Sequence, residues 1–245
     1  MSAHVIGLSG GKDSTALALR LAEVEPRDDY VYLCTPTGDE LPVMEAHWTK
    51  LEGILGKPIV RLRNRTLDAW IDHFDALPNW RQRWCTRLLK IEPTLAYLSK
   101  LEDPILYVGL RADEEARQDI YSEQVTTRFP LREWDWGLED VVGYLKDKGI
   151  KIPERTDCAR CYGQRLSDWY KLWVRHPELY EDAVQQEERI GATFRSPRRD
   201  TWPAQLVQLR RRFADGDTPR GIPKDGILPD EEEEDAADSC RVCRL

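Results

Sequence analysis

A short glycine-rich turn near the start of the chain separates an apolar run from an amphipathic segment. Residues 4–8 are apolar enough for a buried strand, residues 9–14 read Ser-Gly-Gly-Lys-Asp-Ser, and residues 15–22 are apolar at helical spacing. Paired glycines let backbone N–H groups crowd around an anion, and the helix amino terminus adds a partial positive charge. The order strand, turn, helix therefore predicts a phosphate cradle, with a purely structural turn as the alternative.

The spacing of this turn differs from that of the two common nucleotide loops. A Walker loop places four residues between its glycines and the dinucleotide fingerprint needs three glycines, whereas Gly10 and Gly11 are adjacent. The turn resembles the PP-loop of ATP pyrophosphatases, which implies attack on the α-phosphorus of ATP and release of pyrophosphate. Lys12 and Asp13 would then be catalytic, because a lysine ammonium stabilises charge on the departing pyrophosphate. The ATP-binding residues implied by the loop are Ser9, Gly10, Gly11, Lys12, Asp13 and Ser14.

The composition is typical of a globular protein of one domain with appendages. The 245 residues are 41% hydrophobic and 33% charged, which leaves ample material for a core. No apolar stretch reaches the roughly 18 residues that a membrane helix needs, and the loop lies where a cleavable signal would be. We therefore expect a cytoplasmic protein without membrane association.

Apolar runs and helical patterns alternate along the body of the chain. The runs are 30–34, 59–62 and 105–110, and the helical patterns are 43–55, 67–74 and 88–101. Such alternation predicts an α/β fold in which helices flank a parallel sheet through right-handed crossovers. Ligands of such sheets bind beyond the carboxyl ends of the strands, so we expect the loop, residues 35–39 and residues 109–113 to converge.

Composition divides the chain into three predicted parts. Residues 1–155 form the sheet domain, residues 156–213 a helical extension with a Cys-x-x-Cys pair and an arginine-rich segment, and residues 214–245 a mobile acidic tail ending in Cys-x-x-Cys. The tail has ten acidic and four basic residues, so it carries most of the net charge of -8. Its unbroken acidic run at 230–235 predicts a solvated segment. A decoy for a basic partner or for the protein's own basic patch is the alternative.

Four further motifs follow the loop in one order. They are Thr-Gly-Asp-Glu-Leu-Pro at 37–42, Arg-Trp-Cys-Thr-Arg-Leu-Leu-Lys-Ile-Glu-Pro at 83–93, Gly-Leu-Arg-Ala-Asp-Glu-Glu-Ala-Arg at 109–117, and Pro-Leu at 130–131 with Asp-Val-Val-Gly-Tyr-Leu at 140–145. This order resembles the phosphoadenosine-phosphosulfate reductase family over about residues 5–164. The resemblance implies that the motifs line the nucleotide and substrate cleft. It adds Gly38, Gly109 and Arg111 to the ATP-binding residues and makes Lys90 and Arg117 substrate-binding residues.

Two departures decide which branch of that family the chain resembles. Reductases of the family lack the loop lysine and end in a Glu-Cys-Gly-Leu-His peptide, whereas this chain keeps Lys12 and ends Cys-Arg-Val-Cys-Arg-Leu. The lysine favours an ATP pyrophosphatase that adenylylates an acceptor for sulfur transfer, with thiolation of nucleic acid as the predicted outcome. Three alternatives remain open: a phosphoadenylyl- or adenylyl-sulfate reductase, an amidotransferase-like ligase with zinc-bound cysteines, and a non-catalytic nucleotide-binding partner in a larger assembly.

The cysteines predict how sulfur is handled. Cys158 and Cys161 have metal-ligand spacing and Cys85 lies beside the cleft by its motif, so three thiolates could hold a [4Fe–4S] cluster with one open iron. The arrangement resembles tRNA two-thiocytidine enzymes and DNA phosphorothioation pyrophosphatases, which implies a sulfur donor such as a cysteine desulfurase. Cys240 or Cys243 could supply a fourth ligand, and both together would suit zinc. Inert buried thiols are the third reading of the cysteines, and a core position is expected for the sixth, Cys34.

Magnesium and nucleic acid are the remaining predicted partners, and the sequence leaves open a homo-oligomer. ATP chemistry needs Mg²⁺, and sequence alone does not choose among the candidate carboxylates Asp39, Glu40, Asp113, Glu114 and Glu115. Arginines lie in two groups, and the second is interleaved with aromatic residues that suit base stacking. Solvated helix faces are the alternative for both groups. The arginines are Arg61, Arg63, Arg65, Arg195, Arg198, Arg199, Arg210, Arg211 and Arg212.

Overall fold

The computed structural model describes residues 2–114, 121 and 124–229. Within these residues, a five-stranded parallel sheet has the order β3-β2-β1-β4-β5. Its strands are β1 (His4–Gly7), β2 (Val31–Cys34), β3 (Ile59–Arg61), β4 (Ile105–Tyr107) and β5 (Thr126–Arg128). The order reverses between β1 and β4, which creates a crevice at the carboxyl ends of these strands.

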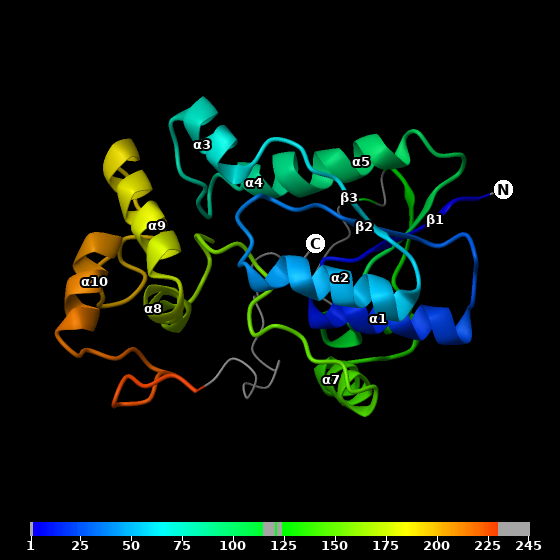
Figure 1. Cartoon of the computed structure of the whole chain (residues 1–245). Helices are drawn as coiled ribbons and strands as arrows, with labels where there is room; N and C mark the ends of the chain where they lie inside the picture. Colours follow the sequence, from blue (N-terminus) through cyan, green and yellow to red (C-terminus); the bar gives the residue numbers. More distant parts are fainter. Residues whose placement is uncertain (1, 115–120, 122–123, 230–245) are drawn as a thin grey trace.

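Helices cover both faces of the sheet (Figure 1). In the first part of the chain they are α1 (Lys12–Val24), α2 (Val43–Leu55), α3 (Leu67–Phe74), α4 (Trp84–Thr86), the π-helical turn η1 (Arg87–Ile91), α5 (Glu92–Leu98), the 3-10 turn η2 (Ala112–Glu114), α6 (Pro130–Glu133) and α7 (Leu138–Asp147). Neighbouring residues of β1 point to opposite faces. Ile6 packs with Leu17 of α1 and Leu51 of α2, while Val5 packs with Leu98 of α5.

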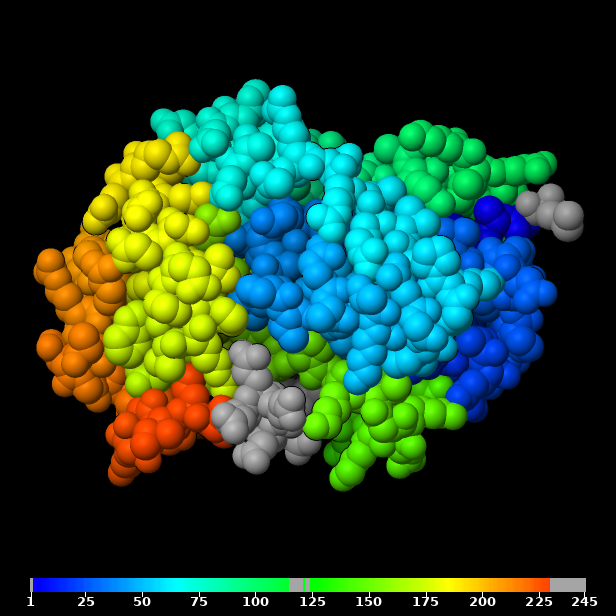
Figure 2. Space-filling model, viewed as in Figure 1, coloured from blue at the N-terminus to red at the C-terminus, as the bar shows by residue number. Residues whose placement is uncertain are grey.

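The second half of the chain adds α8 (Leu166–Arg175), α9 (Pro177–Ile190) and α10 (Leu206–Ala214). These helices share a hydrophobic cluster of their own, in which Trp169, Val184 and Leu209 are buried. The cluster also takes in Leu67 and Ile71 of α3, so the helical extension docks on the sheet domain through that helix. Figure 2 shows the yellow and orange surface of α9 and α10 at one side of the blue and cyan surface of the sheet domain.

Residues 215–229 differ from the expected mobile tail, because they pack against the helical extension. Ile222 is buried in its cluster, and Leu228 packs against the same cluster. The hydroxyl of Tyr170 donates to the Gly226 carbonyl at 3.3 Å, and Arg175 Nη2 donates to the Pro229 carbonyl at 2.6 Å. Apolar residues such as Ile222 and Leu228, spaced among the prolines and glycines, give this segment a side that packs on the core. The charge composition of the segment does not indicate that side. The remaining predicted tail, residues 230–245, lies outside the described residues.

The predicted fold class is confirmed: helices flank a parallel sheet, and a helical region follows. The predicted helical patterns at 43–55 and 67–74 coincide with α2 and α3, and the predicted strands contain β2, β3 and β4. The prediction did not include β5, whose sequence Thr-Thr-Arg lacks an apolar run because it is an edge strand. Within the described part of the chain, no helix is both long and apolar enough to cross a bilayer.

Candidate functional site

The glycine turn leaves β1 at Gly7 and enters α1 at Lys12, as predicted. Gly10 has a φ of 90°, a left-handed conformation that favours glycine, and a Cβ there would lie 2.8 Å from Trp48 Nε1. The same Nε1 donates to the Ser9 carbonyl at 2.9 Å, and His47 Nε2 lies 2.9 Å from the Gly10 carbonyl. The carbonyl and N–H of a trans peptide point in opposite directions, so the amides of Gly10 and Gly11 face away from α2.

His47 acts here as a neutral donor. Burial lowers its pKa, so the ring stays uncharged near neutral pH and its Nε2–H points at the Gly10 carbonyl. Two side chains of α2 thus set the direction of the loop peptides. The sequence prediction missed both His47 and Trp48, because a histidine and a tryptophan on an amphipathic helix look like ordinary core residues.

A cavity of about 120 Å³ opens at the carboxyl ends of β1, β2 and β4. We call it the loop pocket. It is lined by Gly7, Ser9, Gly11, Lys12, Asp13, Ser14, Leu33, Cys34, Thr35, Pro36, Glu40, Trp48, Lys90, Thr94, Leu106, Val108, Gly109, Tyr121, Thr156, Asp157 and Cys158. The loop, the turn after β2 and the turn after β4 therefore converge where the strand order reverses, as the sequence predicts.

Lys12 is the first residue of α1 and is only 3% exposed, yet it lines the loop pocket. An ammonium at a helix amino terminus meets the positive end of the helix dipole, so both favour an anion at the same place. Ser14 Oγ donates to the Gly11 carbonyl at 3.1 Å and lies 3.1 Å from Ser9 Oγ, which joins the two ends of the loop. The pocket end formed by the loop is therefore suited to a phosphate group.

Arg111 was predicted to bind ATP, but it does not line the loop pocket. Its guanidinium is nearly buried and donates to Asp13 Oδ2 and Asp113 Oδ1, each at 2.8 Å, with Glu114 3.6 Å away. Burial alone would lower the pKa of Arg111, but the three carboxylates outweigh it and raise the pKa. The geometry makes Arg111 a support for Asp13 at the start of α1.

Gly109 follows β4 and touches the backbone of the loop helix. A Cβ at this position would lie 3.1 Å from the Asp13 carbonyl carbon and 3.1 Å from the Ser14 nitrogen. Since backbone cannot turn aside as a flexible side chain can, only glycine lets β4 and α1 approach this closely. The motif that carries Gly109 thus sets the width of the pocket.

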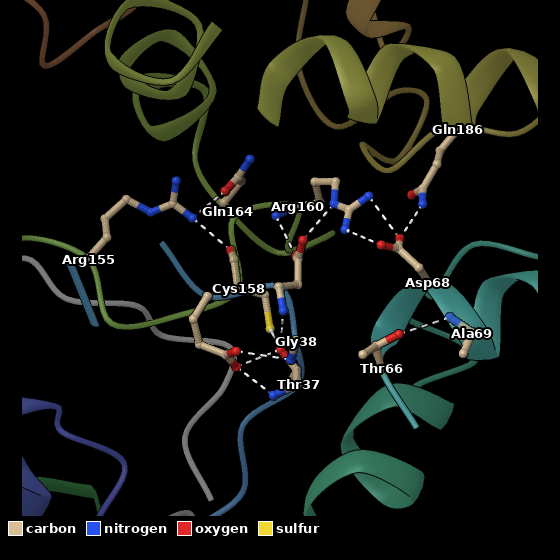
Figure 3. A network of polar contacts seen from close by, with 12 residues as sticks. Thr37, Gly38, Thr66, Asp68, Ala69, Arg155, Cys158, Arg160, Gln164 and Gln186 are labelled. Atoms are coloured by element: carbon tan, nitrogen blue, oxygen red, sulfur yellow. Dashed lines mark hydrogen bonds and ion pairs between the residues drawn. The ribbon is translucent and has the colours of Figure 1, made fainter. Parts of the chain in front are cut away.

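The turn after β2 is closed by a carboxylate. Glu40 accepts from the Thr37 amide at 2.5 Å, the Thr37 hydroxyl at 2.7 Å and the Gly38 amide at 3.0 Å (Figure 3). Gly38 itself has a φ of 77° and is not part of the pocket lining. The structure shows Gly38 shaping the turn, and its role in ATP binding stays a prediction.

The turn that contains Cys158 and Cys161 docks on the turn after β2. Glu40 and Cys158 form an antiparallel bridge, and the Ala159 amide donates to the Asp39 carbonyl at 2.6 Å. Arg160 donates to Asp39 from its amide at 2.9 Å and from Nε at 2.6 Å. Burial raises the pKa of Asp39 to about 6, and Arg160 opposes that shift.

Arg160 extends this contact to the helical extension. Its guanidinium pairs with Asp39 at 2.6 Å and with Asp68 of α3 at 2.9 Å. Gln186 of α9 donates to the same Asp68 (Figure 3). Arg160 thus links the cysteine turn to the turn after β2 and to α3, and α9 joins through Asp68. These charged side chains reinforce the single antiparallel bridge between the cysteine turn and the turn after β2.

Cys158 lines the loop pocket, as does Cys34 at the end of β2. Its Sγ lies 3.2 Å from Thr37 Oγ1, and its carbonyl accepts from Arg155 Nη2 at 2.9 Å (Figure 3). Cys161 is buried and Cys85 packs at the edge of the helical cluster, so neither lines the pocket. Among the residues that the structure describes, no group of three or more histidine, cysteine, aspartate or glutamate side chains could hold a metal ion.

Cys85, Cys158 and Cys161 therefore do not form such a group within the described residues, and the iron–sulfur cluster stays a prediction. Cys240 and Cys243, named as further ligands, lie outside the described residues, as does the substrate candidate Arg117. Lys90 of η1 does line the loop pocket. The predicted site residues that the pocket brings together are Ser9, Gly11, Lys12, Asp13, Ser14, Lys90, Gly109 and Cys158.

The arginine groups that suggested a nucleic-acid surface are largely engaged within the protein. Arg195 is 1% exposed and donates to the Pro203 carbonyl and to Asp200, so its predicted place on a binding surface is wrong. Aromatic neighbours such as Phe194 mark a core there. The other pairs are Arg61–Glu52, Arg63–Glu45, Arg210–Glu181 and Arg212–Asp217.

Comparison with known proteins agrees with the geometry. The family described as the phosphoadenosine phosphosulfate reductase domain matches residues 3–156. A crystal structure of phosphoadenylyl-sulfate (PAPS) reductase from Candida auris, in a phosphate complex, is similar in fold with a TM-score of 0.50 and 14% sequence identity. That match covers 62% of this chain and 75% of that chain. No curated protein matches the sequence.

Proposed function

Because the chain belongs to the phosphoadenosine phosphosulfate reductase domain family, we propose that it is an ATP pyrophosphatase that adenylylates a nucleic-acid acceptor for sulfur transfer. The observation that carries this proposal is the buried Lys12 at the glycine loop, inside the pocket at the switch point of the sheet. A fixed ammonium beside outward-facing loop amides is suited to the β,γ-phosphates of a nucleoside triphosphate.

The proposed reaction has two displacements. An acceptor oxygen attacks the α-phosphorus, the bond between the α-phosphorus and its bridging oxygen breaks, and pyrophosphate leaves with the electron pair. Lys12 stabilises the negative charge that builds on the leaving group, so its effect is larger in the transition state than in the ground state. Sulfide-level sulfur, released from the persulfide of a donor such as a cysteine desulfurase by a thiol that is oxidised to a disulfide, then bonds to the activated acceptor atom. The bond from that atom to the adenylylated oxygen breaks, and AMP leaves with the oxygen and the electron pair.

Asp13 would hold the Mg²⁺ that accompanies ATP. It lines the loop pocket, and while its Oδ2 accepts from Arg111, its Oδ1 is buried without a hydrogen-bond partner. An orphaned carboxylate oxygen is a hard ligand of the kind that magnesium prefers. When bound, the ion would neutralise charge on the phosphate oxygens.

Lys90 is the proposed contact to the acceptor. It comes from η1, on the other side of the loop pocket from α1, and a lysine there can meet a phosphate of nucleic acid. The cytoplasm is the proposed setting, because ATP and reduced thiols are both available there.

A second function is favoured by one observation, the Cys158 thiol in the same pocket. In a sulfonucleotide reductase, a thiolate attacks the sulfonate sulfur, the nucleotide leaves, and a second thiol completes a disulfide as sulfite departs. Cys158 and Cys161 would supply the two thiols and the two electrons. This reaction needs no ATP, and Lys12 would then only bind phosphate.

The test is pyrophosphate release from MgATP in the presence of bulk tRNA or plasmid DNA and sulfide. We expect Lys12→Ala to lower the rate by about 10²- to 10³-fold, as loss of one preorganised charge in a site does. Lys100→Ala, an exposed lysine after α5, is the matched control and should leave the rate unchanged.

Sulfite release from phosphoadenylyl sulfate is measured with the same preparations. Sulfite without pyrophosphate, lost in Cys158→Ser, would establish the reductase instead. Pyrophosphate release that persists in Lys12→Ala would reject the proposed mechanism.

A further inference from the structure

A second and larger cavity, of about 660 Å³, lies away from the loop pocket between α2, α7, α8 and the segment 149–155. Figure 1 shows where α2, α7 and α8 lie in the fold. Its floor is apolar, since Leu145, Ile152 and Leu172 line it and are buried. We call this cavity the basic groove, for the reason given next.

The lining of the basic groove is strongly cationic. Six lysine and arginine residues face it against one carboxylate, Glu154. Glu154 pairs with Lys171 and with Arg175, the latter at 2.5 Å. The six cations are Lys50, Lys146, Lys151, Arg155, Lys171 and Arg175.

Three of these cations have no ionic partner among the residues that the structure describes. Arg155 is turned toward Asp157 at 3.1 Å, but Lys50, Lys146 and Lys151 form no ion pair with any described residue. All three lie on the exposed rim. Like charges gathered over an apolar floor favour an anionic occupant that can also cover that floor.

The described part of the chain ends next to this groove, and an anionic segment follows directly in the sequence. The packed residues 215–229 run along α8, and their last hydrogen bond is the one from Arg175 Nη2 to the Pro229 carbonyl, at 2.6 Å. Arg175 lines the groove. The next six residues are Asp-Glu-Glu-Glu-Glu-Asp, at 230–235.

The reach of this segment suits the groove. Six extended residues span about 20 Å, and a segment tethered at its first residue meets its site at an effective concentration in the millimolar range. At such an effective concentration, exposed ion pairs are sufficient to keep the segment bound. Each pair would add little affinity in a complex of two separate molecules.

We propose that the basic groove binds the chain's own acidic segment, residues 230–235, with its carboxylates against Lys50, Lys146 and Lys151. This docking goes beyond the proposed function and does not depend on it. It gives the acidic run an intramolecular partner and keeps other polyanions out of the groove. It also accounts for a basic cavity in a protein whose net charge is -8.

Zero-length carbodiimide coupling of the full-length protein, followed by peptide mass spectrometry, tests the contact directly. We expect cross-links from residues 231–235 to Lys146 and Lys151 at low salt, at least tenfold above those to Lys100. In 1 M salt, where charges are screened beyond about 3 Å, the yield should fall to the level of Lys100. Equal yields for the groove lysines and Lys100 would overturn the proposal.

A variant with the acids of 230–235 replaced by their amides tests the consequence. We expect hydrogen exchange in residues 145–152 to quicken about fivefold or more, and inorganic polyphosphate to bind about tenfold more tightly than to the wild type. Lys146→Glu should reproduce the exchange change, whereas Lys100→Glu, with the same change in net charge, should not. Unaltered exchange and polyphosphate binding in the amide variant would overturn the proposal.

Mixing of isotopically light and heavy chains before coupling identifies whose tail is bound. Cross-links within one chain support the proposal. Cross-links that join light to heavy chains in the statistical ratio would overturn it in favour of exchange between two copies.

Discussion

The sheet-bearing part of the chain and the helical part that follows Cys158 bury charged groups for different purposes. In the sheet part, Lys12 is buried in the lining of the loop pocket and Arg111 is buried beside it on Asp13, where strands and helices have already paired the backbone. In the helical part, Glu187 accepts from the Phe194 amide at 2.9 Å and the Leu206 amide at 2.7 Å. One carboxylate thus closes both ends of the long connection between α9 and α10.

The difference shows how each part meets its backbone requirements. Parallel strands satisfy one another's amides, so the buried charges near them are not needed to pair the backbone. An irregular connection has no such partner, and buried ionisable side chains supply the missing hydrogen bonds. The helical part should therefore respond more strongly to pH and to loss of a charge than the sheet part does.

The largest effect is expected where the two parts meet. Arg160→Leu leaves Asp39 buried without its counter-ion, and we expect the free energy of unfolding to fall by about 3–5 kcal/mol in urea denaturation. Arg189→Leu, which breaks only an exposed pair with Asp72, should cost no more than about 1 kcal/mol. Similar losses in the free energy of unfolding of the two variants would show that burial does not determine the cost of losing an ion pair here.

A pH effect of similar size is expected inside the helical part. Burial raises the pKa of Glu187 to about 7, above the ordinary 4.5, so the folded state holds the proton more tightly than the unfolded state. The free energy of unfolding should therefore be highest below pH 4.5 and fall by up to about 3 kcal/mol as pH rises through 7.

Urea denaturation between pH 4.5 and 8 measures this slope, and Glu187→Gln should flatten it. Asp39, whose pKa is raised to about 6, adds a fall of the same sign, so part of the slope should remain in the variant. An unchanged slope in Glu187→Gln would contradict the attribution of this pH dependence to Glu187.

The sheet part should respond to shape instead of charge. Gly109→Ala places a Cβ against the backbone at Asp13 and Ser14, and we expect a loss of about 1–3 kcal/mol in stability together with weaker binding of a non-hydrolysable ATP analogue. Gly143→Ala in α7, where a Cβ meets nothing within 4 Å, should raise stability by up to about 1 kcal/mol. Calorimetry on both variants decides whether close approach matters at Gly109.

The smallest effect concerns the support of the loop. Trp48→Phe keeps the ring packing but removes the donor to the Ser9 carbonyl, which should weaken binding of the ATP analogue by about 1 kcal/mol. Trp80→Phe, at an exposed tryptophan, is the control. Equal affinities for the two variants would show that the loop keeps its direction without α2.

The sequence predicts features that depend on neighbours in the chain. The glycine loop, α2 and α3 all follow from local patterns, and the pocket follows from the rule for carboxyl ends of parallel strands. The link between Asp39 and Arg160 joins residues 121 positions apart, and no local pattern indicates it. Arg195 was misplaced for a similar reason, since only tertiary packing distinguishes a buried arginine from a solvated one.

The π-helical turn η1 makes the loop pocket sensitive to chain length. Such a turn carries one residue more than an α-helical turn, and η1 joins α4 to α5 in a continuous helix. Deletion of a single residue within Arg87–Ile91 would restore a regular helix, in which residues of the turn move to new positions around the helix axis while the helices on either side keep theirs. Lys90 would then change its direction relative to Thr94, so the register of this helix, more than its composition, determines whether both face the loop pocket.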